Sequence, residues 1–190
     1  MKIWICWAYS SGKTTIAKDI YVHLDEQDKN WIILDINIER DIAQTLWLDF
    51  NNHTKSEKEK FQLNLFNYTS WIHNDLDDFI TDNPLHTQLG YTENRELIYK
   101  INQIKDNLYD ILFFCEPVEL ENDWVRHTDE AYRKEVYKKI EDAIKDTVAN
   151  NPDIIAVRLM WDKKERLEQA MYIIKEWKHK KFLKWIFNNL

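Results

Sequence analysis

Apolar residues along the chain gather in five short runs, separated by longer stretches in which apolar positions recur at helical spacing. The run at residues 30–36 (NWIILDI) is apolar almost throughout, which is typical of a strand covered on both faces of a sheet. The pattern therefore predicts five strands, at residues 2–9, 30–36, 78–82, 109–117 and 152–160.

The intervening stretches predict helices. In residues 128–148, apolar side chains repeat along one face, and the same spacing occurs in 13–24, 38–48, 61–76, 94–107 and 163–177. The polar residues 51–60 are expected to form a mobile loop. Strands that alternate with helices indicate a parallel sheet with helices on both sides, so we expect an α/β three-layer sandwich. We expect one domain over 1–172, with 173–190 as its basic amphipathic helical extension.

The segment SSGKT, residues 10–14, follows the first predicted strand and opens the first predicted helix. In that position backbone N–H groups and the helix dipole converge on an anion. Lys13 would approach the β- and γ-phosphates of a nucleotide, and the Thr14 hydroxyl would bind Mg²⁺. The alternative is a chance match in which serine caps a helix. The expected nucleotide-binding residues are Ser10, Ser11, Gly12, Lys13, Thr14 and Thr15.

Trp7 occupies the place of the first glycine in the pattern G-x-x-x-x-G-K-[ST]. A bulky residue in an unfavourable backbone region costs about 1–3 kcal/mol. Because the amides that hold phosphate come mostly from the residues after this position, we expect the site to be weakened and not abolished.

Three further stretches resemble one known group. They are FITDNPLHTQLGY (79–91), the segment 109–133 and the segment 154–170. Together with the phosphate loop they resemble the NadR-like P-loop ATPases and kinases, an AAA-type group related to nicotinamide riboside kinase. The resemblance spans about residues 2–170. It implies a P-loop NTPase fold with a five-stranded parallel sheet, ATP and Mg²⁺ as cofactors, and transfer of phosphate to a small molecule.

The resemblance also assigns residues outside the loop. Asp82 would hold Mg²⁺ or deprotonate the acceptor hydroxyl, and Arg126 would clamp the transferred phosphate. Asp123 matches the same element as Arg126, and Arg40 matches an arginine near the acceptor pocket. Alternatively, Asp82 begins a turn before Asn83 and Arg126 is a solvated charge. The catalytic set is thus Lys13, Asp82 and Arg126, with Thr14 and Asp82 at the metal.

Two positions depart from the family pattern, because Asn37 and His86 stand where acidic residues are usual. These departures bear on the acceptor and leave phosphate binding unaffected. Arg166 is expected on the surface of the last helix. The histidines share no spacing typical of a metal cluster.

Charge and composition narrow the partners. A net charge of −7 argues against a chain that coats nucleic acid, and no run approaches the length of a membrane span. Cys6 and Cys115 lie in apolar runs and are expected to be buried free thiols. With no secretory signal visible, we expect a cytoplasmic protein whose partners are a nucleotide and a small-molecule acceptor.

Tryptophan is abundant and glycine scarce, with nine and two residues respectively. Average usage would give about 13 glycines. Four tryptophans stand where the architecture favours glycine: Trp7, Trp47, Trp124 and Trp161. A single cause would explain all four, namely that UGA codons decoded as glycine in the native host have been written as tryptophan.

Three functions remain open. The first is an ATP-dependent phosphotransferase acting on a nucleoside-like hydroxyl. The second is a nucleotide-binding regulatory module with little or no kinase activity. The third is an inactive relative that binds RNA or membrane through the basic residues 178–184.

Overall fold

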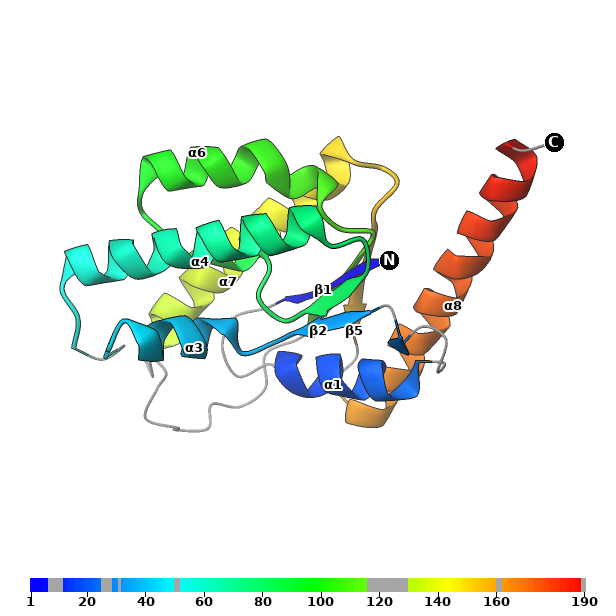
Figure 1. The fold of residues 1–190 in the computed structure, drawn as a ribbon, viewed down its shortest axis with the longest axis horizontal. Helices are drawn as coiled ribbons and strands as arrows, with labels where there is room; N and C mark the ends of the chain where they lie inside the picture. Colours follow the sequence, from blue (N-terminus) through cyan, green and yellow to red (C-terminus); the bar gives the residue numbers. More distant parts are fainter. Residues whose placement is uncertain are drawn as a thin grey trace.

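The computed structural model describes residues 1–6, 12–24, 29–30, 32–49, 52–115, 130–159 and 162–188, with the side chains of 182–188 excluded. Five strands form one parallel sheet in the order β2-β3-β1-β4-β5 (Figure 1). The strands are β1 Lys2–Cys6, β2 Ile33–Asp35, β3 Phe79–Thr81, β4 Ile111–Cys115 and β5 Ile155–Leu159. All five predicted strands are present, although most are shorter than their apolar runs.

Helices connect successive strands. They are α1 Lys13–His23, α3 Ile38–Thr45, α4 Lys55–Asp75, α5 Leu85–Tyr91, α6 Arg95–Ile104, the 3-10 turn η1 Lys105–Asn107, α7 Glu130–Asn150 and α8 Lys163–Asn188. The last helix runs without a break past residue 177, and its C-terminal half extends away from the sheet (Figure 1). Within the described residues, no helix combines the length and apolarity needed to cross a membrane.

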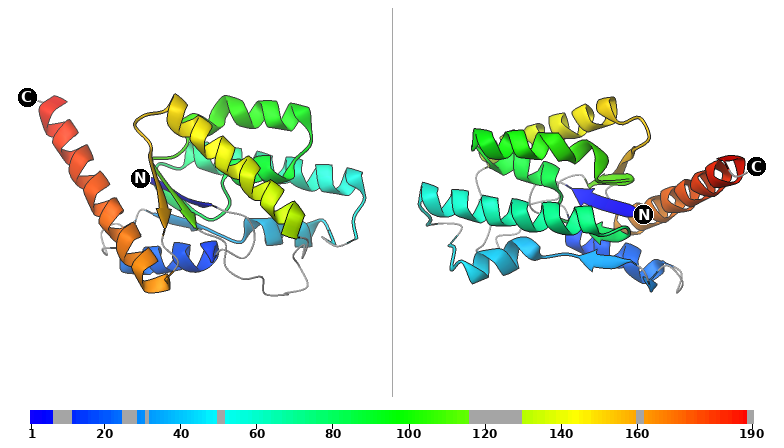
Figure 2. Two further views of the ribbon diagram at one scale, coloured as in Figure 1. Left: turned by 180° about the vertical axis from the view of Figure 1, so that it is seen from behind. Right: turned by 45° about the horizontal axis from the view of Figure 1, so that its top comes forward.

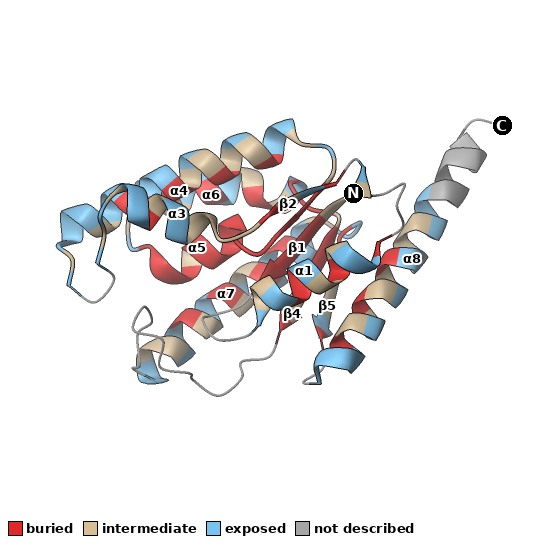
Figure 3. Cartoon of the chain, turned by 60° about the horizontal axis from the view of Figure 1, so that its bottom comes forward, coloured by how far each residue is buried: buried red, intermediate tan, exposed pale blue. Residues whose placement is uncertain are grey.

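Side chains of the central strand alternate between two cores. Trp4 and Cys6 pack with α5, α6 and α7 on one face of the sheet, whereas Ile3 and Ile5 pack with α1 and α8 on the other. Figures 2 and 3 show the two helical layers on either side of the strands. The predicted three-layer α/β sandwich is therefore confirmed, and both cysteines are buried free thiols.

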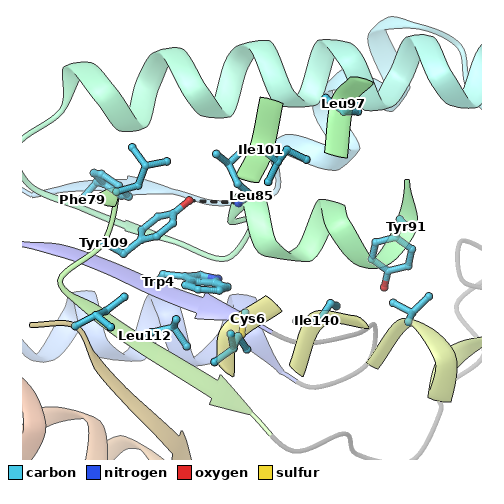
Figure 4. Packing of buried hydrophobic residues seen from close by; sticks show 14 residues of the cluster. Trp4, Cys6, Phe79, Leu85, Tyr91, Leu97, Ile101, Tyr109, Leu112 and Ile140 are labelled. Carbon is cyan, nitrogen blue, oxygen red and sulfur yellow. Dashed lines mark hydrogen bonds between the residues drawn. The ribbon is translucent and has the colours of Figure 1, made fainter. Parts of the chain in front are cut away.

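The core around Trp4 contains stacked aromatic rings and a close contact between helices α5 and α7. The fully buried Trp4 stacks on His86, with ring centroids 4.0 Å apart, and lies beside Tyr109 (Figure 4). Gly90 brings α5 against α7, because a Cβ at this position would lie 2.8 Å from Cγ1 of Ile140. Trp4 therefore belongs to a packed core, unlike the tryptophans expected at turns.

Two local predictions were wrong. Residues 55–60 are the first turns of α4 and not a loop, because Thr54 and Glu57 form a capping box that starts the helix there. Helix α5 was missed, since nearly all of its residues are buried and it presents no polar face from which a helical period could be recognised.

Trp47 has an unusual backbone for its residue type. Its φ is 54°, in the left-handed region, and its side chain is 94% exposed. Such a conformation is uncommon for any residue but glycine and is costly for a bulky side chain. Trp7, Trp124 and Trp161 lie outside the described residues.

Candidate functional site

Two predicted metal-binding side chains meet at one edge of the sheet. The Thr14 hydroxyl, in the first turn of α1, donates a hydrogen bond to Oδ2 of Asp82, the residue after β3. The strand order explains this contact: β3 pairs directly with β1, so the carboxyl ends of the two strands are neighbours. The backbone N–H of Asn37 donates to the other oxygen, Oδ1 of Asp82, at 3.3 Å.

Helix α1 begins at a glycine whose backbone is in the left-handed region. Gly12 caps the helix with φ 73°, and its carbonyl accepts from the N–H of Ile16 at 3.0 Å. Lys13, Thr14 and Thr15 occupy the first turn, where the helix dipole favours an anion. Ser10 and Ser11 lie outside the described residues.

Asp35 is a buried carboxylate at the end of β2 that sequence reasoning missed. Its Oδ2 accepts from the Thr81 hydroxyl at 3.1 Å and contacts Nε2 of His73 at 3.2 Å, while its Oδ1 accepts from the Tyr68 hydroxyl at 3.3 Å. Burial, and secondarily the charge of Asp35, raises the pKa of Tyr68 to about 12. A charged residue closing an apolar strand was the signal that could have identified it.

His73 is held between Asp35 and Tyr109. Its Nδ1 lies 2.9 Å from the Tyr109 hydroxyl, which also accepts the N–H of Leu85 at 3.3 Å (Figure 4). A Tyr109 hydroxyl that donates to Nδ1 leaves the His73 proton on Nε2, facing Asp35. Burial lowers the pKa of His73 despite the opposing effect of Asp35, so the ring is neutral at pH 7. This network fixes the carboxyl ends of β2 and β3 beneath α4.

The remaining predicted residues are placed unevenly. Arg40 is exposed in the first turn of α3, and its backbone N–H donates to the carbonyl of Asn37 at 2.9 Å. Arg40 therefore lies one helical turn after Asn37, the residue whose N–H contacts Asp82. Asp123 and Arg126 lie outside the described residues.

His86 belongs to the core and not to a pocket for an acceptor. Its ring is fully buried, and its Nε2 lies 2.7 Å from the Thr147 hydroxyl of α7. Burial, followed by the nearby Lys105, holds its pKa well below the usual value. Packing against α7 therefore accounts for this histidine, and its bearing on the acceptor stays a prediction.

Among the described residues, several buried polar side-chain atoms on α4 and on the segment that follows Asp82 have no hydrogen-bond partner. Asn83 is 2% exposed, and neither its Nδ2 nor its Oδ1 has a partner. The buried Thr87 hydroxyl and Gln88 Oε1, in α5, are in the same state, as is Gln62 Oε1 in α4. Buried polar groups are nearly always paired, so these unpaired atoms are exceptional among the described side chains.

Arg166 is buried beside Gly12, which corrects the expectation of a surface residue. It is 5% exposed, and a Cβ on Gly12 would lie 3.4 Å from its Nη1 atom. No local pattern predicts this burial, because one charged residue in an amphipathic helix is usually solvated.

The pair Thr14 and Asp82 suits Mg²⁺ by its donor chemistry. Mg²⁺ binds hard oxygen ligands, usually one or two carboxylates together with substrate phosphates and water. A hydroxyl and a carboxylate already in contact at the helix start supply such oxygens, where phosphates would supply the rest.

No family model matches the chain, and no curated protein matches it. Solved structures do match. Deoxyadenosine kinase from M. mycoides aligns with a TM-score of 0.61 and 17% identity, covering 93% of this chain and 99% of that chain. Thymidylate kinase from Ehrlichia chaffeensis gives 0.57 and 17%, covering 90% and 98%. Shikimate kinase from Acinetobacter baumannii gives 0.58 and 11%, covering 94% and 93%. The chain therefore has the P-loop kinase fold, with a parallel sheet flanked by helices.

Proposed function

We propose that the protein is an ATP-dependent phosphotransferase, resembling the NadR-like kinases, that transfers the γ-phosphate to a hydroxyl of a nucleoside-like small molecule. The observation that carries the proposal is the contact between Thr14 and Asp82, which joins the phosphate-binding helix to an acid at the end of the neighbouring strand. Three small-molecule kinases of similar fold support the reaction class.

Lys13, Thr14 and Asp82 have distinct tasks in this reaction. Lys13 would neutralise charge on the β- and γ-phosphates, and the Thr14 hydroxyl would help to hold Mg²⁺, which would supply further charge neutralisation. Asp82 holds the same ion through water or accepts the proton of the attacking hydroxyl. Phosphoryl transfer needs positioning and charge neutralisation more than covalent chemistry, so these few groups suffice.

The acceptor is expected to be polar and to carry amide-like groups. The side chains of Asn83 and Gln88 offer buried carboxamide atoms that lack partners, and a carboxamide both donates and accepts hydrogen bonds. A nucleobase or a pyridine carboxamide presents the complementary pattern. Binding such a group would satisfy atoms that are costly to leave unpaired.

A regulatory nucleotide-binding module is the second candidate. It is favoured by Asn37 and His86, because neither side chain supplies the acid that the family pattern carries at its position. In that case nucleotide would be bound and hydrolysed slowly or not at all.

The test is a screen of nucleosides and pyridine ribosides for ATP-dependent phosphorylation, with the sequence as written and with Trp7→Gly. Once an acceptor is found, Lys13→Ala and Asp82→Asn should each lower turnover by at least about 100-fold. Lys13→Ala should also weaken nucleotide binding, whereas Asp82→Asn should leave it nearly intact.

Matched controls are Lys138→Ala and Asp153→Asn, which change exposed residues of the same types. Both should retain full turnover. Full activity in Asp82→Asn would refute its catalytic role, and nucleotide binding unaffected by Lys13→Ala would refute the phosphate site itself.

A further inference from the structure

Arg166 occupies a place in the fold that the proposed chemistry does not yet use. It lies in the first turns of α8, yet it is 5% exposed, and its Nη1 atom would be 3.4 Å from a Cβ on Gly12. Gly12 immediately precedes Lys13. The Arg166 side chain of α8 therefore approaches the turn from which Lys13 of α1 follows.

The position of Arg166 is fixed by the docking of α8 on α1. The two helices bury a shared apolar core with Ile16, Ala17, Ile20, Leu167, Ala170 and Ile174. An ion pair between Lys163 and Asp19, at 3.1 Å, joins their exposed sides. Figure 3 shows the start of α8 beside α1. The Arg166 side chain is thus buried on a helix that is itself packed against α1, which limits the positions that its guanidinium can take.

The electrostatics of Cys115 supports the same placement. Burial raises the pKa of this thiol, at the end of β4, to about 11, while the charges of Arg166 and Lys13 act in the opposite direction. Both cations therefore exert their fields at the carboxyl end of the sheet, where the phosphate-binding turn lies.

We propose that Arg166 is a second cation of the phosphate site, which binds the phosphate chain of a nucleoside triphosphate together with Lys13 of α1. The inference rests on the proposed nucleotide site. A guanidinium presents several donors in a planar fork that matches phosphate oxygens, which a lysine ammonium does not. The charge of Arg166 also makes the electrostatic potential at the Gly12 turn more positive, independently of its other contacts.

The experiment measures binding of inorganic triphosphate and of adenosine by calorimetry, with Mg²⁺ present. Arg166→Met keeps most of the volume and removes the charge, and should weaken triphosphate binding by about 10- to 100-fold. Arg166→Lys, which keeps the charge but loses the fork, should bind triphosphate with intermediate affinity. Neither change should alter adenosine binding, because adenosine carries no phosphate. Inorganic triphosphate also makes the result independent of the base that the site prefers.

Arg158→Met is the matched control, since Arg158 is an exposed arginine on β5 that pairs with Glu141 at 3.5 Å. It should leave triphosphate binding unchanged. If Arg166 has only a structural role, Arg166→Met should weaken the binding of triphosphate and of adenosine equally, or it should lower the thermal midpoint while the ratio of the two affinities stays the same. Either result would overturn the inference.

Lys13→Ala separates this inference from the proposed function. If Lys13→Ala weakens triphosphate binding and Arg166→Met does not, the inference fails and the phosphate site stands. If neither variant weakens it, the nucleotide site itself is wrong.

Discussion

Replacing Trp47 with glycine should raise the free energy of unfolding. Trp47 has φ 54° and a side chain that is 94% exposed, so it carries the backbone cost of the left-handed region and buries almost no apolar surface. Relief from that region contributes about 1–2 kcal/mol. The greater freedom of glycine in the unfolded chain takes back about 0.5–1 kcal/mol.

The expected net gain is about 0.5–1 kcal/mol. In a chain of 190 residues, each kcal/mol of added stability raises the thermal midpoint by roughly 2–4 °C. Denaturant unfolding measures the difference directly, as a shift of the midpoint at constant slope. The variant and the parent should be compared in the same buffer, with and without nucleotide.

Two other tryptophans provide controls of opposite sign. Trp71 is 62% exposed within helix α4, so Trp71→Gly should lower stability by about 0.5–1 kcal/mol through helix propensity. Trp4 is fully buried, so Trp4→Gly should cost more than the approximately 3–5 kcal/mol of a large-to-alanine change in a core.

A destabilised Trp47→Gly variant would refute the argument from backbone conformation. Its stabilisation, set against the loss in Trp71→Gly, would support the decoding hypothesis at this position. The intact mass of the protein from its native host decides that hypothesis, and tryptophan masses at the four sites would refute it.

Two further predictions follow from buried groups. Burial lowers the pKa of His73 and, more strongly, of His86, so below about pH 6.5 the unfolded chain binds protons that the folded protein excludes. Stability should therefore fall on acidification by up to about 1.4 kcal/mol per pH unit for each histidine, and His86→Gln should reduce the slope of unfolding free energy between pH 6.5 and 5. Gly90→Ala should destabilise by about 1–3 kcal/mol in denaturant unfolding, because the new Cβ would lie 2.8 Å from Ile140; no loss would show that α5 and α7 can separate freely.

The sheet was predictable because its strands are uniformly apolar and are separated by amphipathic helices. Residues 13–24 and 128–148 show a clear helical period, and they correspond to α1 and α7. Helix α5 was not predictable in this way, because it is enclosed between other elements and its buried side chains include His86 and Gln88. Because nearly all of its side chains are buried, α5 lacks the alternation of apolar and polar positions from which a helix is predicted.

At the site, sequence reasoning identified the residues that a motif carries but not those that the fold brings in. Lys13 and Asp82 were identified because they follow strands and match known patterns. Arg166 and Asp35 acquire their surroundings from long-range packing, the first from α8 against α1 and the second from α4 above β2. Such contacts depend on the tertiary arrangement and leave no local signature.

The central position of β1 has a consequence for synthesis of the chain. β1 pairs with β3, which begins at Phe79, and with β4, which begins at Ile111, and the next described strand in sequence, β2, is not beside it in the sheet. β1 therefore has to wait for partners that are made later in synthesis, with its apolar side chains exposed meanwhile. High contact order slows folding, and exposed apolar strands favour aggregation. We therefore expect nascent chains that end before β4 to depend on chaperones, because one edge of β1 stays unpaired until β4 has been made.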